Sequence, residues 1–297
     1  MIPGPIGFPH HPEVGVEIEP DIDAHSHIWT PDVAHYPLAG GFAVADMKPA
    51  SFTAEELLGH CRPAGVGRVN LIQMSFYGFD NSYMLDMIKL YPDRFVGTAV
   101  VDPLADRPDR AMAELGPKGV RAFRILPGLG KLPPARWLEP PGYAAMFSAA
   151  ARDGQALSCL IDPDGFPEVD RMCRRFPETP VIIDHLGRIG VGGTIDPGAV
   201  DALCSLAVHP RVLVKVGAFY ALGRKAPPYD DLAPMIRRVV EAFGADRCMW
   251  ESDCPFQVVR DTYRDSLALV RDRLDFLAPG QKEWLLRRTA ERTFFRR

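Results

Sequence analysis

Short apolar runs alternate with amphipathic segments along most of the chain. The apolar runs are rich in β-branched residues, and their lack of strict polar alternation is typical of strands that are covered on both faces. Eight strands are predicted, at residues 21–24, 68–74, 95–102, 120–126, 157–162, 181–184, 212–216 and 248–252. Eight buried strands in one chain favour a closed parallel barrel.

The segments between the strands show helical periodicity. Helices are predicted at residues 53–61, 82–90, 108–115, 143–152, 167–176, 197–206, 232–243 and 262–276. Thr53 followed by Glu56 supplies a capping box for the first of them. A last helix at 281–294 would pack on the outside of the barrel or on its base. The alternation of strand and helix predicts an α/β fold, a (β/α)₈ TIM barrel.

Three connections are longer than the usual two to six residues, at 30–52, 127–142 and 217–231, and all are rich in Pro and Gly. Each follows a strand. In a barrel these loops build the active-site face, so they are candidates for substrate contacts and lids. Tolerated surface insertion is the alternative.

Composition and charge narrow the class of protein. The 297 residues, 47% of them hydrophobic, suit one barrel domain over 1–297 with a Pro/Gly-rich N-terminal extension at 1–20. That extension lacks the basic and apolar regions of a secretory signal, and no apolar stretch approaches the roughly 20 residues of a membrane span, so we expect a cytoplasmic enzyme with no membrane partner. The net charge of −4 argues against nucleic acid as a partner, and a homo-oligomer is possible. The six cysteines are expected to be reduced.

The first strand ends in two histidines. Residues 21–27 are Asp-Ile-Asp-Ala-His-Ser-His, and strand alternation places His25 and His27 on one face. Two imidazoles on one face can bind a cation or an anionic oxygen. The same alternation predicts that Asp23 lies one step deeper, where it would hydrogen-bond a histidine. Solvated or core histidines are the alternative interpretation of so short a motif.

Polar residues also end the sixth and eighth strands. The apolar run that begins at residue 180 stops at Asp184 and His185. Residues 248–255 contain Asp253, two residues before Pro255. Asp253 alone could be a turn residue or a helix cap. Together with His25 and His27, however, His185 and Asp253 form a set at the carboxyl ends of three strands, where barrel enzymes have their active sites.

These motifs resemble those of a known family. Asp-Ala-His-Ser-His at 23–27, Asp-His-Leu-Gly-Arg at 184–188 and Trp-Glu-Ser-Asp-Cys-Pro at 250–255 are similar to the amidohydrolase-2 branch of the amidohydrolase superfamily. Within it they look most like the lactonase group that includes 2-pyrone-4,6-dicarboxylate lactonase and 4-sulfomuconolactone hydrolase. The resemblance spans roughly residues 20–295, with further support at 78–81 and 119–124. It implies a hydrolase, a probable lactonase.

The chain also departs from parts of the family pattern. The fifth strand has no lysine that could be carboxylated, which disfavours a bridged two-metal site. The seventh strand ends without the histidine expected of zinc decarboxylases in this branch. Residues 219–222 stand where the resembled pyrone lactonase has an arginine, which leaves the substrate open.

Acyl hydrolysis needs a base for water and a group that stabilises the carbonyl oxygen. We expect Asp253 to be the base. His25, His27 and His185, with Asp253, would hold one divalent metal, for which Zn²⁺ is the best match and Mn²⁺ is possible. A metal-independent mechanism in which the histidines donate hydrogen bonds directly is the alternative.

Two arginines near strand ends suggest the substrate. Arg124 and Arg188 could each bind a carboxylate, which points to a small carboxylated lactone or related cyclic ester, although ordinary salt bridges are the alternative. Tyr77, Tyr220 and Lys131 are weaker candidates for substrate binding. Two other functions stay open: a metal-dependent non-oxidative decarboxylase or hydratase of the same branch, and a non-catalytic ligand-binding barrel.

Overall fold

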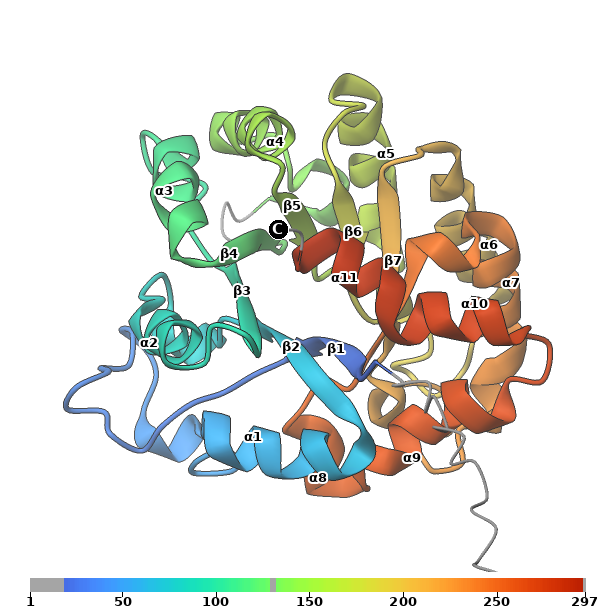
Figure 1. The fold of residues 1–297 in the computed structure, drawn as a ribbon. Helices are drawn as coiled ribbons and strands as arrows, with labels where there is room; N and C mark the ends of the chain where they lie inside the picture. Colours follow the sequence, from blue (N-terminus) through green and yellow to red (C-terminus); the bar gives the residue numbers. More distant parts are fainter. Residues whose placement is uncertain (1–18, 129–131, 296–297) are drawn as a thin grey trace, which may run out of the picture.

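The computed structural model describes residues 19–128 and 132–295. Eight parallel strands lie in sequence order in one sheet that curls into a barrel (Figure 1). The strands are β1 Asp21–Ser26, β2 Val66–Ile72, β3 Phe95–Ala99, β4 Val120–Ile125, β5 Ala156–Cys159, β6 Val181–Ile183, β7 Val212–Gly217 and β8 Cys248–Glu251. The predicted (β/α)₈ barrel is confirmed, and each predicted strand is found within a few residues.

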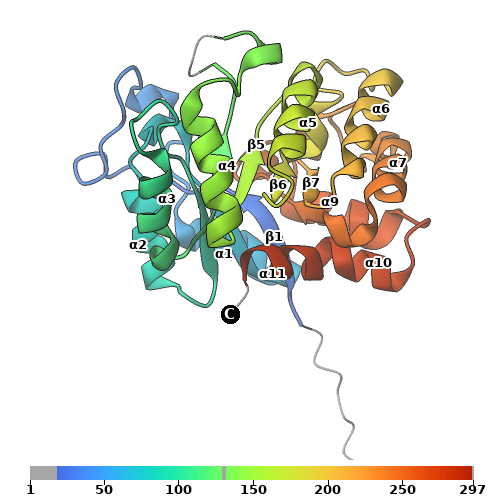
Figure 2. The ribbon, with the colours of Figure 1, turned by 90° about the horizontal axis from the view of Figure 1, so that it is seen from above.

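Helices surround the barrel between successive strands (Figure 2). Seven of them follow β1 to β7: α1 Ala54–Cys61, α2 Ser82–Leu90, α3 Pro108–Leu115, α4 Pro141–Asp153, α5 Phe166–Arg175, α6 Pro197–Ser205 and α7 Ala233–Phe243. Thr53 caps α1, and its capping box with Glu56 is present as predicted. These helices cover the outer face of the strands, which explains why the strands are apolar on both sides.

The chain after β8 differs in detail from the prediction. A short helix that was not predicted, α8 Phe256–Arg260, precedes α9 Tyr263–Ala268. The helix expected at 262–276 is α9 followed by a π-helical turn, Leu269–Arg273. Five residues are too few for helical periodicity to reveal α8 in the sequence.

The last helical segment closes one end of the barrel. It consists of α10 Pro279–Glu283, a π-helical turn Trp284–Arg288 and α11 Thr289–Phe294. Ala290 and Phe294 of α11 are fully buried against inward-facing strand residues such as Ile22 and Met249. Of the two predicted locations, the segment therefore takes the base of the barrel (Figures 1 and 2).

The barrel closes between β1 and β8. The Asp253 N–H donates to the His25 carbonyl (2.9 Å), and the His27 N–H donates to the Cys254 carbonyl (2.7 Å). The Asp23 carboxylate reinforces this seam, because it accepts hydrogen bonds from the Ser252 N–H (3.0 Å) and from the Tyr263 hydroxyl (2.9 Å). The seam fixes the end of β1 against the end of β8.

The predicted contact between Asp23 and a histidine ring is wrong. Asp23 accepts a bond from the backbone N–H of His25, not from a ring nitrogen. The pairing register of β1 shifts between Asp23 and Ser26, as at a β-bulge. Since a bulge inserts one residue, it reverses the alternation that follows it, so Asp23 and His25 point to opposite faces.

Two other expectations concern the whole chain. All six cysteines are free, as predicted. Within 19–128 and 132–295, no helix is long and apolar enough to cross a membrane. Most of the predicted N-terminal extension, residues 1–18, lies outside the described residues.

Candidate active site

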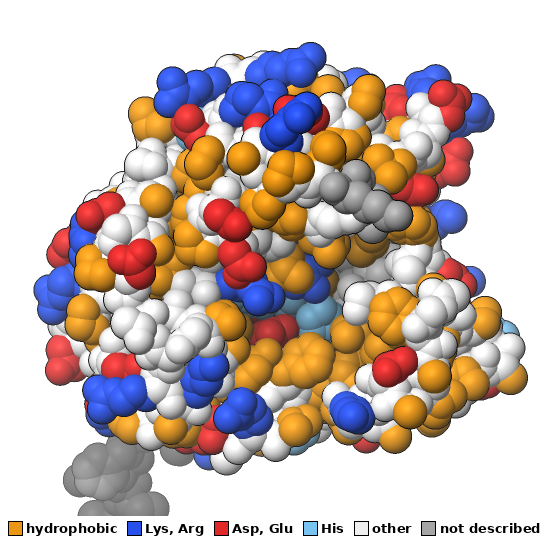
Figure 3. Space-filling model, turned by 180° about the vertical axis from the view of Figure 1, so that it is seen from behind, with side chains coloured by type: hydrophobic (Ala, Val, Ile, Leu, Met, Phe, Trp, Pro, Cys, Tyr) orange, Lys and Arg blue, Asp and Glu red, His pale blue; other side chains and the backbone are white. Residues whose placement is uncertain are grey.

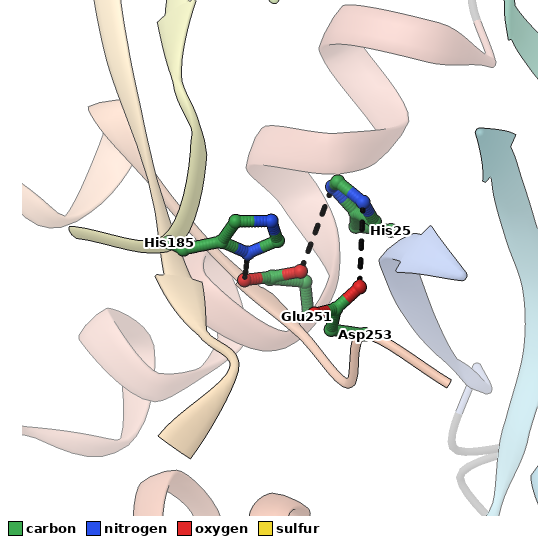
Figure 4. A group of neighbouring side chains, drawn as sticks. All are labelled: His25, His185, Glu251 and Asp253. Carbon is green, nitrogen blue, oxygen red and sulfur yellow. Dashed lines mark hydrogen bonds and ion pairs between the residues drawn. The ribbon is translucent and has the colours of Figure 1, made fainter. Parts of the chain in front are cut away.

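The four residues predicted from the strand ends lie together at the carboxyl end of the barrel. His25 Nε2 is 3.2 Å from His27 Nε2 and 3.6 Å from Asp253 Oδ1. His27 Nε2 is 3.3 Å from Asp253 Oδ1. The His185 ring centroid lies 4.5 Å from that of His25. All four side chains are buried, and Figure 4 shows three of them around a fourth group, Glu251.

Unusual backbone geometry positions His185 and Asp253. Residues 185–188 are all left-handed, with φ of 54° at His185 and 56° at Arg188, and Asp253 has φ of 58°. The left-handed region costs roughly 1–2 kcal/mol for each non-glycine residue. Gly187 is required within this turn, because a Cβ there would lie 2.3 Å from the Phe166 ring. Such strain is typical of functional sites.

Glu251 is a site residue that the sequence analysis missed. Its Oε1 is 2.7 Å from His185 Nδ1, and its Oε2 is 3.6 Å from His25 Nδ1. Burial raises the pKa of Glu251 to about 7. Burial opposes the charge of His185, but Glu251 and Asp253 raise its pKa nonetheless. The two groups therefore share one hydrogen bond, and the pKa of each is raised.

Lys215 was missed as well. Its ammonium lies inside the barrel, 2.9 Å from Asp184 Oδ1 and 3.1 Å from His25 Nδ1. Burial opposes ionisation of Asp184, but Lys215 and Arg124 lower its pKa to about 2. A lysine within an apolar strand is costly unless it is paired, and this was the available signal in the sequence.

The histidine tautomers follow from their partners. His27 Nδ1 donates to the Ile72 carbonyl (3.0 Å), so Nε2 faces the centre of the site. His25 Nδ1 lies 3.1 Å from the Lys215 ammonium and accepts from it. Burial lowers the pKa of His27, and burial together with Lys215 lowers that of His25 well below its ordinary value. Both rings are therefore neutral.

Asp253 is an ionised carboxylate with one free oxygen. Tyr220 donates its hydroxyl to Asp253 Oδ2 (2.7 Å), whereas Oδ1 has no hydrogen-bond partner among the described residues. Burial opposes ionisation, but His185, His27 and Tyr220 hold the pKa of Asp253 well below its ordinary value. The free oxygen faces the histidines, where a bound water or cation would meet it.

A cleft of about 670 Å³ opens above this group. Figure 3 shows the hollow, with histidine and acidic side chains at its floor and hydrophobic side chains around it. Residues at or after the carboxyl ends of all eight strands line it, including Tyr220, Arg124 and Arg188. Tyr77 does not: it is buried, and its hydroxyl accepts from the Thr30 N–H (3.2 Å). Lys131 lies outside the described residues.

The two arginines differ in availability. Arg124 lies near the floor of the cleft, and its Nε is 3.6 Å from Asp184 Oδ2 but has no hydrogen-bond partner in the described part of the chain. Arg188 lies at the rim, where its Nε donates to Asp162 Oδ1 at 2.8 Å. Arg188 is thus already paired, while Arg124 has unused donors.

Two of the three long loops reach the cleft. Ala39, Gly40 and Phe42 contribute from residues 30–52, and residues 218 and 220–222 contribute from the loop after β7. None of the described residues of 127–142 lines it. The first and third loops are therefore the ones placed to contact a ligand.

Comparison with known proteins identifies the family. The family model described as Amidohydrolase, Amidohydro_2, matches residues 22–296. The chain belongs to this amidohydrolase family. The sequence motifs at β1, β6 and β8 had indicated the same family, and the prediction of an amidohydrolase-family enzyme is confirmed.

Curated relatives of this amidohydrolase act on lactones. L-fucono-1,5-lactonase of Burkholderia ambifaria is 30% identical over 79% of this chain and 80% of its own length. The 4-sulfomuconolactone hydrolase of Hydrogenophaga intermedia is 25% identical over 88% of this chain and 83% of its own. Both alignments extend over most of the barrel.

Solved structures share the fold. A probable 2-pyrone-4,6-dicarboxylic acid hydrolase from Acinetobacter baumannii, with citric acid bound, has a TM-score of 0.76 and 21% identity over 93% of this chain and 99% of its own. An amidohydrolase from Burkholderia multivorans with bound zinc has a TM-score of 0.75 and 20% identity over the same shares. At these identities the likeness shows the fold alone.

The donor atoms in this amidohydrolase suit a divalent cation. His25, His185, Glu251 and Asp253 each offer one ligand atom, and these atoms lie within 4.8 Å of one another. Asp253 Oδ1 and Glu251 Oε2 are buried and have no hydrogen-bond partner within the described segments. Unpaired buried carboxylate oxygens are costly, and a cation between them would remove that cost. Compared with the predicted ligand set, Glu251 is an addition, and His27 is not part of the group.

Proposed function

We propose that this amidohydrolase hydrolyses a small carboxylated lactone or a related cyclic ester. The observation that supports it most is the free, ionised oxygen of Asp253 beside His25, His27 and His185 on the floor of the cleft. A carboxylate base next to imidazoles is the equipment of acyl hydrolysis. The names of the two curated relatives, a lactonase and a lactone hydrolase, support the cyclic ester.

The proposed reaction uses Asp253 twice. Its free oxygen takes a proton from water as the water oxygen attacks the lactone carbonyl. The bond between the carbonyl carbon and the ring oxygen then breaks, and the proton moves from Asp253 to that oxygen, which leaves as an alcohol. The product is a hydroxy acid, and Asp253 returns to its ionised state.

Cationic donors would stabilise the carbonyl oxygen as it gains charge. In the metal-independent alternative, the raised pKa of His185 favours its protonated form, in which Nε2 can donate. Arg124 Nη2 lies 3.4 Å from this atom and adds positive charge. Donors that are fixed before the reaction begins are worth a factor of about 10²–10³ each in kcat.

His25, His27, His185 and Asp253, with Glu251, are the residues that would hold a divalent metal. Such an ion would lower the pKa of a water molecule and polarise the substrate carbonyl. We propose Zn²⁺, which imidazole and carboxylate ligands suit, with Mn²⁺ as the alternative. About one equivalent of zinc by elemental analysis, and loss of activity on chelation, are expected. Full activity at negligible metal content would assign the histidines to direct hydrogen bonding.

Arg124 is the residue that we propose for the substrate carboxylate. It is half-buried at the cleft floor, and its Nε has no hydrogen-bond partner among the described residues. A guanidinium can bind a carboxylate through two parallel bonds. Arg188 is a weaker candidate because Asp162 already occupies its Nε.

A panel of carboxylated and neutral lactones of equal ring size, assayed by acid release with a pH indicator, tests the proposed function. Ring opening of the carboxylated members is expected, without CO₂ release. CO₂ release would instead indicate the decarboxylase of the same branch, and addition of water to a double bond without ring opening would indicate a hydratase. Binding without turnover across the panel would indicate a ligand-binding barrel.

A further inference from the structure

Away from the catalytic group, the walls of the cleft are apolar. The lining includes Met74, Val100, Leu126, Leu160, Val191 and Leu222, which come from six different strand ends or loops. The nearby polar side chains are largely engaged: the Gln73 amide donates to the Asp80 carbonyl, and the Tyr220 hydroxyl donates to Asp253. Ser75 is a further polar residue of the lining, and it is exposed.

Two phenylalanines extend this apolar wall to the rim. Phe42 lies on the loop after β1 and Phe79 on the loop after β2, and both line the cleft while 42% and 46% exposed. The loops are joined by a hydrogen bond from the Ala39 N–H to the Phe76 carbonyl (2.9 Å). Exposed aromatic rings at the edge of a concave site are typical of ligand contacts.

The cleft offers little unpaired positive charge. Among its described lining residues the cationic side chains are Arg124 and Arg188, apart from histidines. The Arg188 Nε is paired with exposed Asp162, whereas the Arg124 Nε, 3.6 Å from Asp184 Oδ2, has no hydrogen-bond partner among the described residues. Lys215 is fully buried below the floor and is paired with Asp184. Among the described residues, Arg124 is therefore the cation at the cleft floor that a substrate carboxylate would reach.

We infer that the substrate is a lactone with a single carboxylate and an apolar alkyl or aryl substituent that packs against Phe42, Phe79 and the aliphatic wall. The inference rests on the proposed function for the identity of the reacting group. It separates this chain from enzymes for sugar lactones, whose hydroxyls need hydrogen-bond partners, and from enzymes for dicarboxylates, which need a second free cation. A hydroxyl or carboxylate held against this wall would lose water without gaining a partner.

A matched series of lactones tests the inference. All members carry one carboxylate on the same ring and differ at one position, which bears hydrogen, propyl, phenyl, hydroxymethyl or a second carboxylate. Burial of one methylene is worth up to about fourfold in kcat/KM. The propyl and phenyl compounds are therefore expected to exceed the hydrogen compound by about tenfold or more. A hydroxymethyl or dicarboxylate substrate that equals or exceeds the propyl compound would overturn the inference.

Substitutions at the rim locate the preference. In Phe42→Ser and Phe79→Ser, the ratio of kcat/KM for the propyl and hydrogen compounds is expected to fall by about threefold or more. Val44→Ser is the matched control, because Val44 is 55% exposed two residues from Phe42 but does not line the cleft. Its ratio should equal that of the wild type. An unchanged ratio in both phenylalanine variants would contradict the assigned wall.

A binding measurement separates failure of this inference from failure of the proposed function. Calorimetric titration with the ring-opened hydroxy acids of the same series reports affinity without turnover. If no lactone is hydrolysed, the proposed function is wrong. The titration alone then tests whether the wall of the cleft prefers an apolar substituent. Tighter binding of the propyl acid than of the hydroxymethyl acid, reduced in Phe42→Ser and Phe79→Ser, would support the apolar wall. Equal affinities would overturn it.

Discussion

The chemistry of Asp253 depends on its immediate neighbours. One oxygen accepts from Tyr220, and the other faces His25 and His27 at 3.6 and 3.3 Å. The lowered pKa of this carboxyl keeps it ionised across the whole neutral range. Asp253 is therefore available as a base at neutral pH.

Asp253→Asn is expected to lower kcat by about a hundredfold or more, because a positioned base contributes roughly 10² to 10⁴ to the rate. Asparagine keeps the shape of the side chain, so the thermal unfolding midpoint should show a folded protein. Asp164→Asn, an exposed carboxylate in the turn after β5, is the control and should keep wild-type kcat. Near-normal turnover by a folded Asp253→Asn protein would remove Asp253 from the mechanism.

Asp184 makes a different contribution, to stability. Its pKa in the folded protein is about 2, against an ordinary value of 3.8, owing to Lys215 and Arg124. A group with a lowered pKa stabilises the fold above its ordinary value, and that stability is lost as the pH falls toward the folded value. We expect the unfolding free energy to fall by on the order of 2 kcal/mol between about pH 4 and pH 2 on this account.

Substitutions test this assignment. Asp184→Asn leaves the Lys215 ammonium buried without its carboxylate, so a loss of about 3–5 kcal/mol at neutral pH is expected. The double variant Asp184→Asn with Lys215→Met removes both charges and should recover part of that loss. Denaturant titrations at pH 7 and pH 3 measure both effects. If Asp184→Asn is as acid-sensitive as the wild type between pH 4 and 2, another group is responsible.

Among the elements, the strands were predictable and their fine geometry was not. The apolar runs indicated all eight strands, because each is covered on both faces and contains few polar residues. The bulge in β1 left no such signal, and it reversed the predicted side of Asp23. The prediction that His25 and His27 lie together still holds, since their Nε2 atoms are 3.2 Å apart.

The two site residues that were not predicted, Glu251 and Lys215, depend on contacts between strands that the local sequence does not reveal. Glu251 and Lys215 lie in β8 and β7, and their roles depend on contacts with β1 and β6 residues far away in sequence. Local patterns identify the polar residue at a strand end, as they did for His185, but not its partner across the barrel. The close approach of β7 to β8 at Gly217 is another contact that the local sequence does not reveal, since a Cβ there would lie 2.2 Å from the Glu251 carbonyl oxygen.

The seam between β1 and β8 gives a prediction for these elements. Asp23 is fully buried and accepts bonds from Ser252 and Tyr263. Tyr263→Phe removes one donor and should cost about 1–3 kcal/mol, since it also weakens the pairing of a buried carboxylate. Asp23→Ala leaves several donors unpaired and should cost more. Because the seam holds His25 and His27 against Asp253, kcat should fall in Asp23→Ala.

For Asp23→Ala, the change in stability and the change in kcat are measured separately. Chemical denaturation gives the stability change, and kcat is measured well below the unfolding midpoint so that only folded protein contributes. A loss of stability in Asp23→Ala with unchanged kcat would show that the seam does not position the histidines.

The molecule as a whole has two different ends. The carboxyl ends of the strands open into the cleft, whereas α11 covers the opposite end (Figures 1 and 2). Barrel enzymes separate function and stability in this way, with chemistry at the carboxyl face and packing at the base. Between the two ends lie Lys215 and its charged partners, with the Lys215 ammonium 6.0 Å from the Phe294 ring.

Phe294→Ala is expected to destabilise the protein by about 3–5 kcal/mol, because it removes a fully buried ring from the base and leaves a cavity. For a chain of this size, the unfolding midpoint should fall by roughly 10 °C.

Phe295→Ala is the matched control. The Phe295 ring is next in the chain but is only partly buried, with the Arg68 guanidinium 4.9 Å from its centre, so a smaller shift of the midpoint is expected. Because the base lies opposite the cleft, kcat/KM of Phe294→Ala at a temperature well below its midpoint should stay within about twofold of the wild type. Equal midpoint shifts for the two variants would show that α11 does not close the barrel through Phe294, and a large loss of kcat/KM in folded protein would show that packing at the base is coupled to the site.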